Sequence, residues 1–316
     1  MARITQSVVA ARAGVSGATV SRAIHGDPSV LPETREHVLN ICRQLGYKPS
    51  IAARHLSQGG KAVVGLSLGV RDHAESRYVS LMHQALSAEL AASSWSVRMI
   101  SRADFNDKLD IGGLILLGVL AGDPRLETRL ARRVPTIAIG HDTGRFCVAP
   151  DDAAGGVLAA EHLISTRRTR LATLFTHETD GSISLRIKSF CDAVRKEGLD
   201  LEMVDVPPSP TPSLQGYRAM ARALSGARRF DGVFCETDEI ALGAISALED
   251  AQIAVPHEVG LVGFDDLPTL AHDLSTIRQD IPGIASAAIN LLSEAKRGAD
   301  PRSILTPVTM IRRKTS

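Results

Sequence analysis

Most of this chain alternates between short apolar runs and amphipathic segments, and this alternation constrains the fold more than any single motif. The apolar runs are continuous, as in GGLILLG at 112–118. Continuous apolar strands separated by helices indicate parallel sheets covered on both faces. The pattern occurs twice, which predicts two α/β sheets in tandem. We expect strands at 62–69, 95–100, 112–118, 135–140, 169–175, 201–206, 230–236 and 259–266, and helices near 81–92, 185–197, 217–224 and 239–249.

The composition excludes several classes of protein. The 316 residues suffice for two or three domains, and 44% hydrophobic content with 36 basic and 35 acidic residues excludes a disordered chain. The longest apolar stretch, 111–122, is shorter than the roughly 18–20 residues that cross a bilayer. The first residues lack the apolar core of a signal peptide, and the four cysteines show neither disulfide nor zinc spacing. We therefore expect a cytoplasmic protein with no membrane segment and no cofactor.

Basic residues are concentrated at the beginning of the chain. Residues 1–61 contain eight Lys and Arg against three acidic residues, a net charge of +5, whereas the remainder carries −4 of the total of +1. A basic module ahead of a mildly acidic body favours a polyanionic partner for the module alone. A solvated basic face without any partner is the alternative reading of the charge.

The basic module has the pattern of three short helices. The first begins at Thr5 and ends near residue 12, with Val8 and Val9 facing inward. Gly14 permits the positive φ of a tight turn, and Ser16 is the expected N-cap of the second helix. A third helix begins with a proline and ends before a glycine. Two short helices joined by a turn and braced by a third form a helix-turn-helix unit.

The second helix has the chemistry that DNA recognition needs. Arg22 can donate a bidentate pair of hydrogen bonds to guanine, and Gly17 and Ala18 are small enough to let the helix enter the major groove. First-turn amides and hydroxyls can donate to phosphate oxygens. The hydroxyls are those of Ser16, Thr19 and Ser21. Ordinary capping in a small helical bundle is the alternative interpretation of these hydroxyls.

A family resemblance makes the DNA-binding interpretation specific. Residues 9–56 read VAARAGVSGATVSRAIHGDPSVLPETREHVLNICRQLGYKPSIAARHL. They contain, in order and at family spacing, the elements VA…AGVS..TVSR.I.G, V.PETRE.V, LGY.P and AAR.L. This run resembles the N-terminal DNA-binding domain of lactose-repressor (LacI/GalR) family regulators. The resemblance implies base contacts from Gly17, Ala18 and Arg22, and backbone contacts from Thr5, Ser16, Thr19, Ser21 and His25.

Residues 50–57 resemble the hinge helix of that family. The segment is too short to be a stable isolated helix, so it is expected to order when two copies pair on DNA. The resemblance implies that Leu56 is an apolar wedge that opens a base step in the minor groove. A lone apolar residue in a linker is the alternative for Leu56. The implied hinge residues are Ser50, Ala53, Arg54 and Leu56.

The remainder of the chain resembles the family's effector domain, which has the two-lobed periplasmic-binding-protein fold. The implied fold is therefore an all-α helix-turn-helix head followed by an α/β effector domain. The implied division is 1–48 for the head, 49–61 for the hinge and linker, and 62–316 for effector binding and dimerisation. The first lobe would take about 62–150 and 281–305, and the second lobe about 151–280 and 306–316.

Matching positions imply an effector site between the lobes, at the carboxyl ends of the strands. An arginine among carboxylates can bind hydroxyls or a small anion. For Arg186 and Asp265, a structural ion pair is the alternative, and for Asp266 a loop cap. The single tryptophan, Trp95, is assigned to core packing rather than to ligand stacking. The implied effector residues are Tyr78, Asp151, Ser182, Arg186, Thr237 and Asp265.

The chain departs from the family pattern in three places. Leu31 occupies the position of a capping residue before the third helix, which costs that helix a cap of about 1 kcal/mol. Gly17 and Ala18 have no side-chain hydrogen bonds to offer, so base reading depends on Arg22, the hinge and DNA shape. Only residues 101–111 separate two strands that the family joins through a helix, so that helix is expected to be truncated or lost.

The sequence therefore predicts a dimeric regulator of transcription, most simply a repressor, that binds a palindromic operator and responds to a small molecule such as a sugar or sugar phosphate. It would lie in the cytoplasm, associated with the nucleoid. An effector-independent or activating regulator of the same family is the alternative, and a solute-binding protein would need an export signal. An enzyme on the same fold is a remote alternative, because GxSxG, HExxH, GxxxxGK[ST] and GxGxxG are absent.

Overall fold

The computed structural model describes the head and both α/β units, and leaves the linker between them outside the described residues. The described residues are 6–24, 29–45, 47, 62–68, 76–93, 95–101, 105, 109–177, 184–226, 230–268 and 273–316. The predicted hinge at 49–61 therefore lies outside the described part of the chain. Among the described residues, no helix combines the length and the apolar character needed to span a membrane.

The head contains three helices, α1 (Gln6–Ala13), α2 (Gly17–Ile24) and α3 (Pro32–Leu45). Their core is closed by side chains that are fully buried, such as Val9, Val20 and Val38. Gly14 has a φ of +66°, which confirms the tight turn between α1 and α2. The expectation that Val8 faces inward was wrong, because its side chain is 43% exposed while Val9 is buried. Adjacent helical residues lie about 100° apart, and the face of α1 that meets the core carries Val9 and Ala10 and leaves Val8 toward solvent.

The first lobe, as we use the term, is the first six-stranded sheet with the helices that pack on it. Its strand order is β11-β5-β4-β3-β1-β2, with all neighbouring strands parallel. The strands are β1 (Ala62–Ser67), β2 (Trp95–Met99), β3 (Gly113–Val119), β4 (Thr136–Gly140), β5 (Cys147–Pro150) and β11 (Ser303–Thr306). The helices are α5 (Arg77–Ala92), the 3-10 turn η2 (Pro124–Glu127), α6 (Arg129–Arg133) and α11 (Ile281–Arg297).

The second lobe is the second six-stranded sheet with its helices, and it repeats the strand order of the first. Its order is β12-β10-β9-β8-β6-β7, with β12 antiparallel to β10. The strands are β6 (Arg170–Phe175), β7 (Asp200–Asp205), β8 (Gly232–Cys235), β9 (Gly260–Asp265), β10 (Ser275–Gln279) and β12 (Val308–Ile311). The helices are α7 (Asp152–Ser165), α8 (Leu185–Lys196), α9 (Pro212–Leu224) and α10 (Asp238–Asp250).

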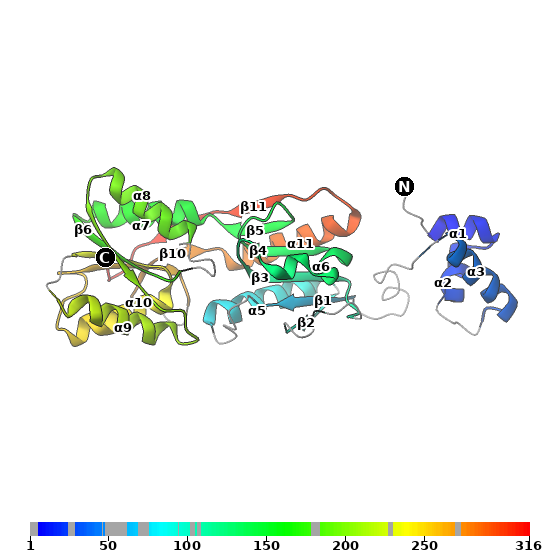
Figure 1. Ribbon diagram of the computed structural model, residues 1–316, viewed down its shortest axis with the longest axis horizontal. Helices are drawn as coiled ribbons and strands as arrows, with labels where there is room; N and C mark the ends of the chain where they lie inside the picture. The colour runs from blue at the N-terminus through cyan, green and yellow to red at the C-terminus, as the bar shows by residue number, and fades with distance from the viewer. Residues whose placement is uncertain are drawn as a thin grey trace.

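Both sheets are buried on both faces, as their continuous apolar strands predict. In β3, Ile115 packs into a core with α5 and α11, while Leu114 on the opposite face packs with α6. In β6, Leu174 faces α9 and α10, and Leu171 faces α7 and α8. Figure 1 shows these two helix pairs on opposite sides of the second sheet. The side-chain period of two along each strand therefore divides each lobe into two cores.

Three further observations concern the remaining sequence expectations. Of the segment 101–111, the structure describes only residues 101, 105 and 109–111, so the truncated helix expected there lies largely outside the described residues and stays a prediction. Trp95 packs against the core formed with α5 and α11, with the Lys296 ammonium 3.8 Å from its ring centroid, so the packing assignment is confirmed. The four cysteines are all buried free thiols.

Candidate functional site

The beginning of α2 is a capped helix end with an open surface. Ser16 is its N-cap, because the Thr19 amide donates to the Ser16 Oγ at 3.1 Å. The two hydroxyl oxygens lie 2.9 Å apart, which ties both side chains into the first turn. Gly17 has no atom within 4 Å of the position where a Cβ would stand, so nothing covers this turn among the described residues.

The proposed base-reading residues share the exposed face of α2. Val20 and Ala23 are buried against α1 and α3, which fixes the rotation of the helix about its axis. Gly17, Ala18 and Arg22 are then all exposed. Because residues four apart lie one above the other on a helix, Ala18 and Arg22 form one continuous strip. Thr19 and Ser21 are partly buried beside it.

Several predicted residues lie outside the described part of the chain, so the structure does not test them. From the head these are Thr5 and His25. From the hinge they are Ser50, Ala53, Arg54 and Leu56, and from the effector site Ser182.

Arg186 organises the candidate effector site in the second lobe. Its Nε donates to the Asp152 Oδ1 at 3.0 Å and its Nη1 donates to the Glu236 carbonyl oxygen at 2.9 Å. The Asp265 Oδ1 lies 3.8 Å from the same Nη1, and the guanidinium stacks 3.6 Å from the centroid of Phe264. The side chain is only 14% exposed, so these contacts replace most of its hydration. Arg186 can therefore form these ion pairs and still take part in an effector site.

The close approach of α7 to α8 explains how Asp152 reaches Arg186. Gly156 lies one helical turn after Asp152, and a Cβ there would stand 2.1 Å from the Arg186 carbonyl oxygen. Only glycine allows the two backbones to come this near. Asp152 is the first residue of α7, where a carboxylate also interacts favourably with the helix dipole.

Asp265 is held in a strained and buried position at the end of β9. Its φ is +115° and that of Asp266 is +55°, values that side-chain-bearing residues rarely adopt. The Gln279 Nε2 donates to the Asp265 Oδ1 at 2.6 Å, while the Gln279 Oε1 is buried and has no partner among the described residues. Burial raises the pKa of Asp265 well above its ordinary value, against the opposing charge of Arg186. The alternative that Asp266 caps a loop is replaced by ion pairs to Arg278 at 2.6 Å and Arg313 at 2.7 Å.

Tyr78 brings the first lobe to this group. It is the second residue of α5, partly buried against the core that contains α11. Burial raises the pKa of its phenol above the ordinary range, and the negative charges of Asp265 and Asp152 raise it further while Arg186 lowers it. The beginning of α5 meets the second lobe, since the Ser76 Oγ donates to the Glu239 Oε2 at 3.2 Å. We call Tyr78, Asp152, Arg186, Glu236 and Asp265 the interlobe cluster.

Asp151 and Thr237, two of the predicted effector residues, cap helices in this structure. The Asp151 Oδ1 accepts from the Ala154 amide at 2.9 Å, and the Thr237 Oγ1 accepts from the Ile240 amide at 3.2 Å. Both still adjoin the cluster along the chain, because Asp151 precedes Asp152 and Thr237 follows Glu236. Their contact with an effector remains a prediction.

Asp238, which follows Thr237, is a buried carboxylate behind the cluster. Its oxygens accept from the Thr276 hydroxyl at 2.6 Å and the Leu267 amide at 2.8 Å. Burial raises its pKa to about 7, although both hydrogen bonds lower it. The neutral form of the acid therefore predominates below neutral pH.

Sequence reasoning missed Asp152, Glu236 and Gln279. A signal existed for Asp152, since DDAAGG offers two adjacent acids, but only the helix register decides which one caps and which one reaches Arg186. Glu236 contributes mainly a backbone carbonyl here, while its side chain accepts from the Thr176 amide at 2.7 Å. Among the described residues, no group of His, Cys, Asp and Glu is placed to hold a metal ion.

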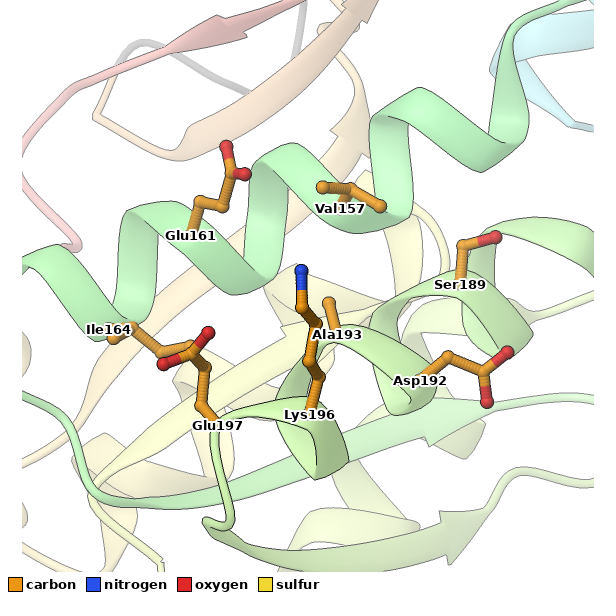
Figure 2. A pocket seen from close by; sticks show the side chains of 8 residues that line it. All are labelled: Val157, Glu161, Ile164, Ser189, Asp192, Ala193, Lys196 and Glu197. Atoms are coloured by element: carbon orange, nitrogen blue, oxygen red, sulfur yellow. The ribbon is translucent and has the colours of Figure 1, made fainter.

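A separate groove lies on the outside of the second lobe, between α7 and α8 (Figure 2). Among its labelled side chains, the basic Lys196 lies between acidic residues such as Glu161 and Asp192. None of the predicted effector residues lines it. Its lining residues are Val157, Glu161, Ile164, Ser189, Asp192, Ala193, Lys196 and Glu197.

Comparison with known proteins identifies the family. Residues 8–50 match bacterial regulatory proteins of the lacI family, and residues 160–316 match the periplasmic binding protein-like domain. The HTH-type transcriptional regulator MalR of Streptomyces coelicolor is 30% identical, across 98% of this chain and 95% of that protein. The chain belongs to the lacI family of bacterial regulatory proteins. Both parts of the predicted fold are thereby confirmed, and the enzyme alternative is set aside because this is a family of transcription regulators.

Solved structures of lacI-family regulators share the fold over the whole chain. The transcriptional regulator CelR in complex with cellobiose superimposes with a TM-score of 0.70 at 22% identity, covering 99% of this chain and 100% of that chain. The lac repressor dimer bound to operator and the anti-inducer ONPF gives a TM-score of 0.71 at 23% identity, covering 99% of both chains. At these identities the likeness concerns the fold alone.

Proposed function

We propose that this lacI-family member is a repressor that binds a palindromic operator as a homodimer and releases or tightens its hold when a small molecule binds between the lobes. The exposed strip of α2 supports DNA reading, since Gly17, Ala18 and Arg22 form one open face beside a capped helix end. A dimer would place two copies of α2 in major grooves about one helical turn of DNA apart. The lac repressor structure named above is likewise a dimer on operator DNA.

The interlobe cluster carries the proposal for the effector. Arg186 already faces the carboxylates Asp152 and Asp265, so an anionic ligand would have to displace an ion pair of 2.8 Å. Hydroxyl groups can instead donate to the carboxylates and accept from the guanidinium without that displacement. We therefore favour an uncharged carbohydrate over a sugar phosphate. The disaccharide complex of CelR supports the same class of ligand.

The proposed residues keep the roles given by the resemblance. The head takes residues 1–48, the hinge and linker 49–61 and the effector domain 62–316, a division supported by the membership of the two sheets. Such a regulator would act in the cytoplasm, on the nucleoid. The proposed base contacts are Gly17, Ala18 and Arg22, and the backbone contacts Thr5, Ser16, Thr19, Ser21 and His25. The hinge contacts are Ser50, Ala53, Arg54 and Leu56, and the effector contacts Tyr78, Asp151, Ser182, Arg186, Thr237 and Asp265.

A thermal-shift panel of carbohydrates tests this proposal. Neutral mono- and disaccharides, matched sugar phosphates and amino sugars would be added to the full-length protein. A ligand present at 100 times its dissociation constant stabilises the folded state by about 2.7 kcal/mol, which is readily measured. We expect at least one neutral sugar to stabilise the protein and its phosphate to stabilise it less. Stabilisation by phosphates alone would contradict the proposed class.

The sign of regulation distinguishes the alternatives within the family. Whichever sign holds, linkage requires an effector that weakens operator binding to bind less tightly to the operator-bound form. A ligand found in the panel would be titrated with and without operator DNA. Equal affinity in both states would indicate an effector-independent regulator, and activation in a transcription assay would indicate an activator.

A further inference from the structure

A side-chain hydrogen bond joins the two lobes directly. Ser76 is the N-cap of α5 in the first lobe, and its Oγ donates to the Glu239 Oε2 in the first turn of α10 in the second lobe, at 3.2 Å. The two residues are 163 positions apart in the sequence. Both side chains are part-buried at this contact, so water competes only partly for it.

The Ser76 hydroxyl does not accept the hydrogen bond that an N-cap side chain usually accepts. A serine at this position normally accepts a hydrogen bond from an amide of its own first turn. Ser76 makes no such bond, although its φ of −63° and ψ of 132° are those of an N-cap residue. Thr237, Asp151 and Asp280 cap their own helices with their side chains. The N-caps Ser184 and Thr211 do not, so the direction of the Ser76 hydroxyl, rather than the missing cap bond, distinguishes this residue. The hydroxyl of Ser76 is instead directed to the other lobe.

Glu239 completes the end of α5 from outside. The amides of a first helical turn carry partial positive charge, and a carboxylate placed there is stabilising. Glu239 supplies this charge across the junction between the lobes. Its own position at the beginning of α10 is favourable for the same reason. One carboxylate therefore interacts favourably with helices of both lobes, in this relative arrangement of the lobes only.

The contact lies beside the interlobe cluster. Ser76 is two residues before Tyr78, and the charge of Glu239 is among the causes that raise the pKa of Asp265. Any movement of α5 relative to α10 that breaks the contact also moves Tyr78 relative to Asp265 and Arg186. The contact and the candidate effector site therefore change together.

We propose that Ser76 and Glu239 form a latch that holds the lobes in the arrangement of this structure and sets how readily they change it. They are positioning residues, because they act through α5 and α10 rather than through the ligand. The latch itself needs neither effector nor DNA. Its consequence for regulation rests on the proposed function: the latch would set the population of one of the two states between which an effector selects.

Distances between the lobes in the ligand-free protein test the latch. Met99 on β2 and Met203 on β7 are 45% and 39% exposed, so Met99→Cys and Met203→Cys provide one label in each lobe. Pulsed electron–electron double resonance would give the distribution of distances between the two spin labels in full-length protein, with labelled subunits diluted into unlabelled ones. We expect one dominant distance in the otherwise unchanged protein. In Ser76→Ala and in Glu239→Gln, a second distance should gain about three- to tenfold in relative population.

A double-mutant cycle and matched controls separate a latch from a general loss of stability. The double variant should shift the populations no further than either single variant, and Ser76→Thr, which keeps the hydroxyl, should restore the original distribution. Ser93→Ala and Glu249→Gln change exposed residues at the opposite ends of α5 and α10 and should have no effect.

An unchanged distribution in both single variants, or independent and additive effects, would overturn the latch. Neither outcome would bear on carbohydrate or operator binding, which this experiment does not involve. Conversely, a failed carbohydrate panel would leave the distance measurements valid. The latch and the proposed function can therefore fail separately.

Discussion

Arg186 contacts groups in three parts of the second lobe. It reaches Asp152 on α7, the Glu236 carbonyl after β8, and Phe264 and Asp265 at the end of β9. A side chain with so many partners is fixed in place before any ligand arrives. Preorganisation of this kind reduces the entropy lost on binding, so Arg186 is the residue on which effector affinity should depend most.

Replacing Arg186 tests that dependence. Arg186→Ala should weaken effector binding by about 1.5–3 kcal/mol, tenfold or more in Kd, because a charged hydrogen-bonding group is lost. Operator binding without effector should persist, since the head is untouched. Calorimetric titration and an operator-binding assay would measure the two effects. Arg195→Ala, on an exposed side chain of the same helix, is the control. A normal effector response in Arg186→Ala would remove Arg186 from the site.

Arg22 is the corresponding residue of the head. Arg22→Ala should cost about 1–3 kcal/mol of operator affinity and relax specificity at one base position. Arg12 is exposed in the last turn of α1, so its replacement removes the same charge at a position away from the strip formed by Ala18 and Arg22. Arg12→Ala should weaken binding to all sequences alike. Affinities for single-base variants of the operator would distinguish them, and uniform weakening by Arg22→Ala would disprove the base contact.

Residue identity was predictable from sequence where the chemistry is distinctive, and less so where geometry decides. Arg186 and Asp265 were both expected at the site, and the structure places them 3.8 Å apart. The resemblance named Asp151 and not Asp152, yet Asp152 makes the ion pair with Arg186 while Asp151 caps α7, because one residue of helix register separates the two positions. Gln279 went unnoticed, since a single glutamine in a polar strand carries no pattern.

At the scale of elements, the packing of α9 on α10 fixes where the second lobe presents its carboxylates. Glycines allow the two helices to touch through their backbones. A Cβ at Gly243 would stand 1.9 Å from the Ser213 carbonyl oxygen, and one at Gly216 would stand 2.4 Å from that of Ile240. Because α10 begins with Asp238 and Glu239, any displacement of α10 also displaces these acids.

A methyl group between α9 and α10 tests how tightly this packing is specified. Gly243→Ala should lower the free energy of unfolding by about 1–3 kcal/mol, because backbone cannot yield as a flexible side chain can. Gly226→Ala is the matched control, since nothing lies within 4 Å of its Cβ position. Urea unfolding would give both values. Equal stability of the two variants would show that the helices can separate without cost.

Some elements were predictable from the periodicity of the sequence, and others, including the long helices α7 and α11, were not. The helices expected near 185–197 and 239–249 agree with α8 and α10 within one residue at each end. The strands β5, β10, β11 and β12 were not anticipated. β5 has only four residues, and β10 reads STIRQ, whose burial comes from its place inside the sheet rather than from apolar composition. Tertiary context decided these elements.

At the scale of the whole molecule, the buried carboxylates should give stability an unusual pH dependence. The pKa of Asp238 is raised to about 7 in the folded protein from an ordinary 3.8, and that of Asp265 is also raised. The folded state therefore binds more protons than the unfolded state between these pH values, and the contribution of Asp238 is lost as pH rises through 7. Thermal unfolding between pH 4 and 8 should show this fall, and Asp238→Asn should flatten it. A contribution that grows with pH would contradict the assignment.

The two lobes share one strand order, and this symmetry was foreseen only as a repeated alternation. The periodicity of the sequence predicts parallel strands with helices between them, but not their order in each sheet. The division that places 281–305 in the first lobe and 306–316 in the second, and so separates β11 from β12, came only from the family resemblance. The chain crosses between the lobes near Asp151, Asp280 and Pro307. These three crossings and the Ser76–Glu239 contact all connect the first lobe to the second. A change at the interlobe cluster can therefore alter the arrangement of both lobes.

We expect the basic head to read a specific duplex, and the selection of operator fragments tests this expectation most directly. Full-length protein would be used to enrich genomic DNA, and the enriched duplex would compete with random DNA in fluorescence anisotropy at several salt concentrations. We predict an enriched palindrome that binds at least about 1,000-fold more tightly than random sequence at physiological salt. The affinity for random DNA should fall steeply with salt. Failure to enrich any palindrome, with equal affinities for all duplexes, would contradict the account.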